Sequence, residues 1–219
     1  MNGNGEIDYT QELLRKGIHL LALAIPIVYA LTNKEIMLWL MIPITTISIT
    51  LDIFSRRKTK AQVIMHKIFG NMLRPHEYND ELSLNGASWV LLSGCICIII
   101  FPKIITITGL SILIISDISA ALIGRKIGKH KLFDKSWEGT GVFWLSALII
   151  VGYIGIVNHA PWTFFLFGSI SALIGGIIEA ASHVLRVDDN ISIPMTIGII
   201  LWIGGLISIG LNAPYMNLM

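Results

Sequence analysis

The chain of 219 residues is 54% hydrophobic and 14% charged, and its mean hydropathy is +0.73. These values exclude a water-soluble globular domain, and a formal net charge of +2 gives no reason to expect a nucleic-acid partner. Apolar runs of about 20 residues, the length that crosses a bilayer, recur along the chain. We therefore expect an all-α, polytopic membrane protein with about seven transmembrane helices and a cytoplasmic amphipathic helix.

The predicted transmembrane helices are joined mostly by short connections. Their ranges are residues 17–32, 35–53, 84–101, 104–124, 141–158, 161–181 and 191–211. Proline residues in the 102–103 and 158–161 connections favour tight turns there. Because no internal repeat or linker divides the chain, we expect one integral-membrane domain over residues 1–219.

The basic residues are distributed very unevenly between the two predicted sides of the membrane. One side, here called the basic side, holds fourteen of the lysines and arginines, and the other side holds only Lys34 and Lys103. The fourteen are Arg15, Lys16, Arg56, Arg57, Lys58, Lys60, Lys67, Arg74, Arg125, Lys126, Lys129, Lys131, Lys135 and Arg186. The positive-inside rule predicts that this side is cytoplasmic, with the N-terminus inside and the C-terminus outside.

Residues 56–76 combine apolar positions at helical spacing with lysine and arginine between them. This pattern predicts an amphipathic helix on the cytoplasmic leaflet, and an ordinary solvated loop helix is the alternative.

Several acidic residues lie where charge is costly, at the ends of apolar runs on the basic side. They are Asp52, Asp117 and Glu179, and Asp188 and Asp189 follow on the same side. Carboxylates near lysines suggest a polyanion held by metal and cations together, since Mg²⁺ usually binds one or two carboxylates plus substrate phosphates. Asp52 is equally well explained by pairing with a nearby arginine.

Asp117 begins a row of small residues at helical spacing, followed by Ala121, Gly124 and Gly128. Small side chains on one helix face allow close approach of a ligand, or of another helix. The motif "GRKIGKH" is not a P-loop, because the spacing of its glycines and the residue after its lysine differ from that pattern.

A cluster of cations follows this row, at Arg125, Lys126, Lys129, Lys131 and Lys135. Lysine binds phosphate as a point charge. In "KSWEGT", Gly139 and Thr140 add backbone and hydroxyl donors at a predicted helix start, which favours phosphate binding.

The N-terminal motif "ELLRKGIH" places Glu12, Arg15, Lys16 and His19 on one helical face. Topology alone is enough to explain Arg15 and Lys16. For His19, inside an apolar run, a structural role is favoured and a functional role is the alternative. Asn85, which opens the third predicted helix, either caps it or binds a polar partner.

These motifs, with "NGASW" and "IIEAASHVLRVDDNISIP", resemble the CTP-dependent lipid-alcohol kinases of the diacylglycerol/polyprenol kinase family, over residues 12 to 195. The phosphatidate cytidylyltransferases carry a block similar to residues 116–140. Their next motif contains an Asp that is missing here, since residues 175–180 read GGIIEA, and their Lys-Arg and Pro-Gly-His-Gly-Gly motifs are also absent. The kinases are therefore favoured.

The resemblance implies a site for CTP with a divalent metal ion, Mg²⁺, formed mainly by residues 116–140. Its nucleotide-binding residues would be Asp117, Ala121, Gly124, Gly128, Lys129, Lys131, Lys135, Glu138, Gly139, Thr140 and, from the later acidic block, Asn190. The metal would be held from among Asp117, Glu179, Asp188 and Asp189.

The expected reaction transfers the γ-phosphate of CTP to a lipid alcohol, either a polyprenol such as dolichol, phytol or diacylglycerol. Lys135 would neutralise phosphate, and Asp117 or Asp189 would accept or orient the hydroxyl proton. Two alternatives stay open: a cytidylyltransferase that makes a CDP-lipid, and a transporter that uses the intramembrane acids.

Overall fold

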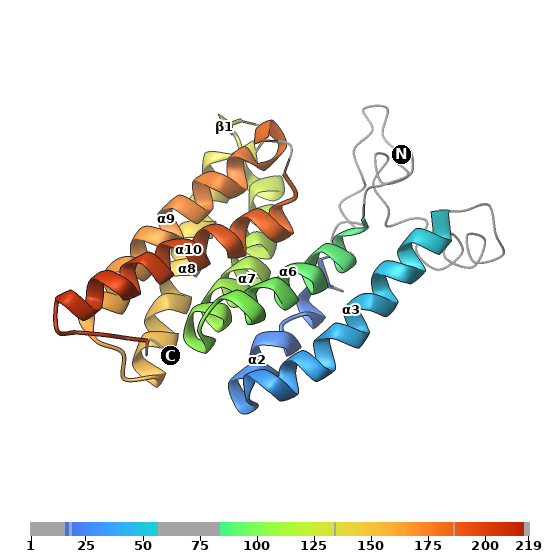
Figure 1. Ribbon diagram of the computed structural model, residues 1–219. Coiled ribbons are helices and arrows are strands. Elements are labelled where there is room, and N and C mark those ends of the chain that lie inside the picture. The colour runs from blue at the N-terminus through green and yellow to red at the C-terminus, as the bar shows by residue number, and fades with distance from the viewer. Residues whose placement is uncertain (1–15, 18, 57–83, 134, 186, 217–219) are drawn as a thin grey trace.

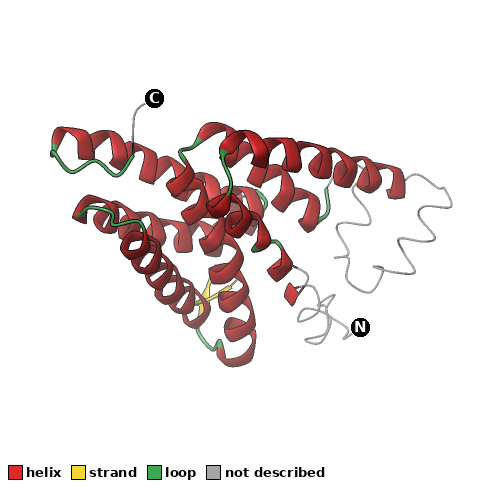
Figure 2. Cartoon of the chain, turned by 90° about the horizontal axis from the view of Figure 1, so that it is seen from below, coloured by secondary structure: helices red, strands yellow, loops and turns green. Residues whose placement is uncertain are grey.

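The computed structural model describes residues 16–17, 19–56, 84–133, 135–185 and 187–216. The described chain is helical apart from one short hairpin (Figures 1 and 2). Its elements are α2 (Ala24–Leu31), α3 (Lys34–Arg56), α6 (Gly86–Ile100), α7 (Lys103–Ile127), β1 (Lys131–Leu132), β2 (Lys135–Ser136), α8 (Trp137–Val157), α9 (Trp162–Leu185) and α10 (Asp189–Gly210).

Five of the described helices are long and apolar enough to cross a membrane: α3, α7, α8, α9 and α10. At 1.5 Å per residue, the 25 residues of α7 cover about 37 Å, more than the roughly 30 Å hydrocarbon core. The 15 residues of α6 cover only about 22 Å. The all-α membrane fold is confirmed, whereas the count of seven spans stays a prediction. Of the predicted amphipathic helix over residues 56–76, only Arg56 is described, as the last residue of α3.

The predicted first span is interrupted. Ala22 and Leu23 form a turn whose amides bond to carbonyls three residues back, at 3.0 Å each. Pro26 explains the break, because its ring nitrogen has no hydrogen to donate to the carbonyl of Ala22. That carbonyl accepts from the amide of Ile25 instead, at 2.9 Å, and α2 starts from this point.

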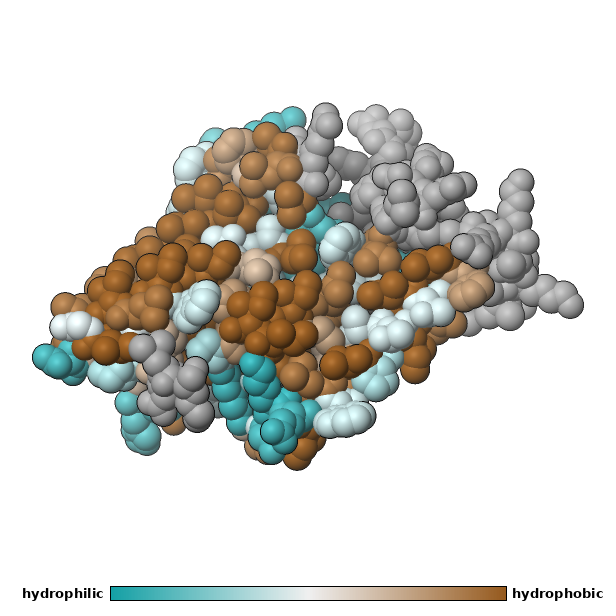
Figure 3. All heavy atoms as spheres, in the orientation of Figure 1, coloured by the Kyte–Doolittle hydropathy of each residue, from teal (hydrophilic) through white to brown (hydrophobic). Residues whose placement is uncertain are grey.

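Helix α7 lies at the centre of the bundle, in contact with α2, α6, α8 and α10, whereas α3 packs mainly on α6. It is the most buried of the five long helices, and α3 is the least buried. Apolar side chains cover much of the face shown in Figure 3. Because so many large apolar residues on the helices are exposed, lipid is the solvent that this surface fits.

The connections gather at two opposite ends of the bundle (Figure 1). One end, here called the hairpin end, carries β1, β2 and the α9–α10 connection. The opposite turn end carries the α2–α3, α6–α7 and α8–α9 turns. This arrangement agrees with the predicted alternation of the connections, and which compartment each end faces stays a prediction.

The two lysines of the turn end have structural roles. Lys103 Nζ donates to the carbonyl oxygens of Ala30 at 2.9 Å and Thr32 at 2.7 Å, and Lys34 Nζ donates to that of Ile99 at 2.7 Å. These carbonyls lie at helix C-termini, where a cation compensates the helix dipole.

Candidate functional site

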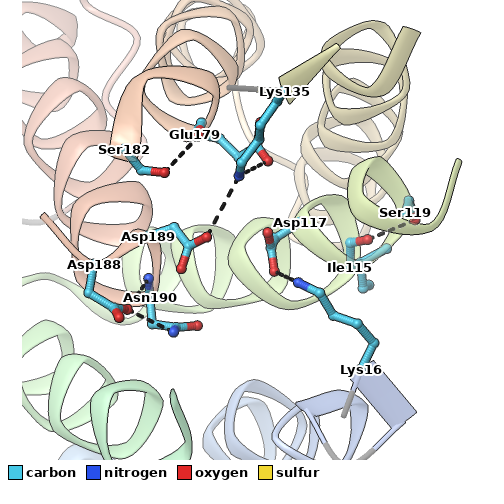
Figure 4. Close-up of polar contacts among 10 residues, drawn as sticks. All are labelled: Lys16, Ile115, Asp117, Ser119, Lys135, Glu179, Ser182, Asp188, Asp189 and Asn190. Atoms are coloured by element: carbon cyan, nitrogen blue, oxygen red, sulfur yellow. Dashed lines mark hydrogen bonds and ion pairs between the residues drawn. The ribbon is translucent and has the colours of Figure 1, made fainter. Parts of the chain in front are cut away.

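The predicted site residues meet at the hairpin end, where α7, β2, α9 and α10 converge (Figure 4). Lys135 comes from β2 and Asp117 from α7, while Glu179 and Asp189 come from α9 and α10. In Figure 4 dashed lines join the ammonium group of Lys135 to Glu179 and Asp189, while Asp117 is joined to Lys16. Residues more than 70 positions apart in the sequence therefore form one cluster.

The hairpin places Lys135 over the cluster. Strands β1 and β2 pair antiparallel, with Lys131 opposite Ser136, and Phe133 in the connecting turn has a φ of 54°. The side chain of Ser136 accepts from the amide of Gly139 at 3.1 Å and caps α8. The sequence analysis did not predict this hairpin, because strands of two residues leave no alternating pattern.

A second contact closes the hairpin at its base. His130 Nδ1 lies 2.8 Å from Glu138 Oε1, and the amide of His130 donates to the same oxygen at 3.3 Å. Glu138 thus holds the segment between α7 and β1 against the first turn of α8. Its predicted contact with nucleotide stays a prediction.

Lys135 is paired with two carboxylates. Its Nζ hydrogen-bonds Glu179 Oε1 and lies 3.7 Å from Asp189 Oδ2. The side chain of Glu179 is 1% exposed, and those of Lys135 and Asp189 are 25% and 18% exposed. Burial disfavours the charged ammonium, but the attraction of Glu179, Asp189 and Asp117 outweighs it and raises the pKa of Lys135 above its ordinary value.

Asp117 forms a separate ion pair with Lys16, which lies just before α2 (Figure 4). Both side chains are buried, at 5% exposure for Lys16 and 3% for Asp117. The charges of Lys135 and His19 also act on this carboxylate. Sequence reasoning missed the role of Lys16 in this pair and explained it by topology, although the helical spacing of "ELLRKGIH" pointed to one face.

Asp188 and Asn190 organise the start of α10. Asp188 Oδ1 accepts from the backbone amide of Asn190 at 2.9 Å and from its side-chain amide at 2.8 Å. Asp188 is therefore the N-cap of α10, and this cap brings Asp189 toward Lys135.

Gly124 and Gly128, at the end of α7, pack tightly against α8 and β2. A Cβ atom on Gly124 would lie 3.2 Å from the Cα of Gly139, and one on Gly128 would lie 2.6 Å from Ser136 Oγ. Close approach of α7 to α8 and β2 is thus one reason for these glycines. Both glycines, with Ala121 and Thr140, stay predicted nucleotide-binding residues.

The other cations that the sequence places near Lys135 are exposed: Arg125, Lys126, Lys129 and Lys131. They present positive charge at the hairpin end without being buried in it. An approaching polyanion would meet these cations before it reached Lys135.

Asp52 and Asn85 have a structural explanation away from this cluster. Asp52 is buried and accepts from the backbone amide of Asn85 at 2.6 Å. Asn85 Oδ1 accepts from the amide of Ser88 at 2.8 Å and caps α6. The capping role predicted for Asn85 is therefore confirmed.

The cluster fits a metal ion only if other ligands complete the shell. Within the described ranges, no group of three or more His, Cys, Asp or Glu residues is arranged to hold a metal. Glu179 Oε2, however, is buried and has no hydrogen-bond partner among the described residues. One or two carboxylates that leave room for phosphate oxygens are what Mg²⁺ usually takes from a protein.

Two curated proteins are similar to this chain. "Uncharacterized protein RP860" of Rickettsia prowazekii (strain Madrid E) is 33% identical over 191 residues, which are 86% of this chain and 92% of that protein. "CTP-dependent diacylglycerol kinase 1" of Saccharomyces cerevisiae is 26% identical over 183 residues, or 74% of this chain. The match covers 62% of the yeast protein, less than two thirds of its length. No family model and no solved structure matches the chain.

Proposed function

We propose that this chain, which belongs to the same family as the Rickettsia protein RP860, is a CTP-dependent lipid kinase. It transfers phosphate to the hydroxyl of a membrane lipid. The candidate acceptors are a polyprenol such as dolichol, the alcohol phytol, and diacylglycerol. The similarity to the yeast kinase supports the reaction class and the use of CTP.

One observation carries the proposal: Lys135 lies between Glu179 and Asp189 at one end of an apolar helical bundle. Lysine and carboxylates together suit a metal-bound phosphate group. The lipid-facing surface suits an acceptor whose tail stays in the bilayer. A water-soluble nucleotide and a membrane-bound hydroxyl could both reach this end.

The proposed step breaks the bond between the γ-phosphorus and its bridging oxygen and forms a bond from that phosphorus to the lipid oxygen. CDP leaves, and the hydroxyl proton passes to a carboxylate, for which Asp117 and Asp189 are the candidates. Lys135, Lys129 and Lys131 stabilise the phosphate charge. The main contribution of the protein is positioning and charge neutralisation, as in other phosphoryl transfers.

A divalent cation such as Mg²⁺, when bound, would supply further neutralisation of the phosphates. Its proposed ligands come from the four carboxylates of Asp117, Glu179, Asp188 and Asp189. The unpartnered oxygen of Glu179 supports this assignment most directly.

We place the reaction on the cytoplasmic side of the membrane, with the N-terminus inside and the C-terminus outside. The excess of lysine and arginine in the connections of the hairpin end supports this orientation.

The test uses the purified full chain in mixed micelles with Mg²⁺, a panel of lipid alcohols and CTP labelled on either the γ- or the α-phosphate. A kinase transfers the γ-label to the lipid and releases CDP. A cytidylyltransferase, acting on phosphatidate in parallel assays, transfers the α-label and releases pyrophosphate. Asp117→Asn should lower the kinase rate at least about a hundredfold. No γ-label on any lipid would refute the proposal.

A further inference from the structure

Lys135 occupies the carboxylates that the proposed function assigns to a metal–nucleotide complex. Its Nζ hydrogen-bonds one oxygen of Glu179 and lies 3.7 Å from Asp189 Oδ2. A divalent cation binds carboxylate oxygens at about 2.0–2.6 Å. Bound to Glu179 or Asp189, even through Glu179 Oε2, it would lie only a few ångströms from the Lys135 ammonium, and the repulsion between the two positive charges opposes binding of both.

The charge of the cluster favours such an exchange. Among the residues in Figure 4 that form ion pairs, the carboxylates of Asp117, Glu179 and Asp189 face only two ammonium groups, those of Lys16 and Lys135. Glu179 and Asp189 thus share one ammonium group among these ion pairs, while the charge of His19 acts on Asp117. Glu179 is also 1% exposed, with its Oε2 unpartnered among the described side chains. A buried carboxylate oxygen without a partner is costly, and a cation would satisfy it.

The side chain of Lys135 can change partners without a change in the hairpin. Its four-carbon side chain is flexible and a quarter exposed, and it starts from a strand of two residues. The base of the hairpin is held by the contact between His130 and Glu138, and Ser136 caps α8, so neither contact depends on the Lys135 ammonium. The lysine can therefore turn away from the carboxylates while the hairpin keeps its place.

Resting on the proposed function, we propose that Lys135 is a resident counter-ion. In the nucleotide-free protein it neutralises Glu179 and Asp189 and keeps free divalent cations off them. When a metal–nucleotide complex arrives, Lys135 gives up both carboxylates to the metal and pairs with the phosphates. The exchange couples metal binding to nucleotide binding, because the lysine leaves only when phosphate offers it an equal partner.

The test measures cation binding without nucleotide, using Tb³⁺ as a luminescent probe that prefers carboxylate oxygens. Trp137 lies two residues after Lys135 and is half exposed, so it can sensitise bound Tb³⁺. The full chain is placed in phosphatidylcholine nanodiscs, which add no anionic lipid. Lys135→Met should bind Tb³⁺ at least about tenfold more tightly than the wild type, because the competing charge a few ångströms away is gone.

Two variants control for unrelated effects. Lys126→Met removes one exposed positive charge at the same end and should leave Tb³⁺ affinity unchanged. Lys135→Arg keeps the charge and should also stay at the wild-type affinity. Adding Trp137→Phe to Lys135→Met should reduce the luminescence, which places the ion near this tryptophan. Should Lys135→Met prove too unstable to purify, Lys135→Gln gives the same comparison with a side chain that still hydrogen-bonds Glu179.

Equal affinities of wild type and Lys135→Met would overturn the inference. A gain in Lys126→Met as large as that in Lys135→Met would do the same, because net charge would then explain the effect. A final arm adds CTP to the wild type, which should raise Tb³⁺ affinity. If this arm alone fails, the proposed nucleotide chemistry is wrong while the occupancy of the carboxylates by Lys135 stands.

Discussion

The buried pair of Lys16 and Asp117 gives a sharp prediction about stability. Both side chains are at most 5% exposed, so Lys16→Met leaves a carboxylate buried without its main partner. Removing one member of a buried pair costs about 3–5 kcal/mol. Because Lys135 also attracts Asp117, we expect the lower end of this range, about 3 kcal/mol in the free energy of unfolding.

The double variant Lys16→Met/Asp117→Leu should recover most of this loss, since no buried charge then stays unpaired. The assay is denaturant unfolding of the full chain in micelles, followed by tryptophan fluorescence, as a double-mutant cycle completed by Asp117→Leu, in which the double variant should regain about 2–3 kcal/mol relative to Lys16→Met. Lys126→Met, exposed at the same end, is the control and should stay within about 0.5 kcal/mol of the wild type.

The same cycle separates folding from chemistry. The double variant should be stable and yet inactive in the γ-phosphate assay, because Asp117 is gone. If Lys16→Met loses less than about 1 kcal/mol, or if the double variant is no more stable than Lys16→Met, the carboxylate is not buried and paired as described.

Three further outcomes follow from the contacts at the hairpin end and at α6. Gly128→Ala should lower the free energy of unfolding by about 1–3 kcal/mol, because its Cβ would lie 2.6 Å from Ser136 Oγ; Gly141→Ala, where nothing lies within 4 Å, should cost nothing in the same unfolding assay. Asn85→Ala should cost about 1 kcal/mol through loss of the α6 cap, and Asn85→Ser should restore most of it; equal stability of all three proteins would contradict the cap. The pKa of Lys135 is raised, so the stability that its charge contributes is complete below the ordinary lysine pKa of about 10.4 and is lost only as pH rises through the higher native pKa. The difference in unfolding free energy between wild type and Lys135→Met should therefore be constant from pH 7 to about pH 9. A decline within that range would refute the ion pairing of Lys135 with Glu179 and Asp189.

The pairing of the buried acids with lysines could be expected from the sequence, because the residue type limits the possibilities. A carboxylate such as Asp117 or Glu179 in an apolar run is so costly that it needs a partner, and lysines at the same end were the natural ones. Which lysine meets which acid was not predictable. Lys135 pairs with Glu179, 44 residues away, and Lys16 pairs with Asp117, 101 residues away.

The amino-acid sequence alone determined the membrane class, the helical fold and the end of the bundle where charge collects, because each follows from the transfer of apolar and charged groups between water and lipid. The start of α6 was also close to local rules, as the Asn85 cap illustrates. Only the tertiary structure decided the hairpin, the broken first helix as a neighbour of α7, and the position of Lys135 between two acids. These depend on how α7, α8, α9 and α10 pack, and packing is set by side-chain fit between segments far apart in the chain.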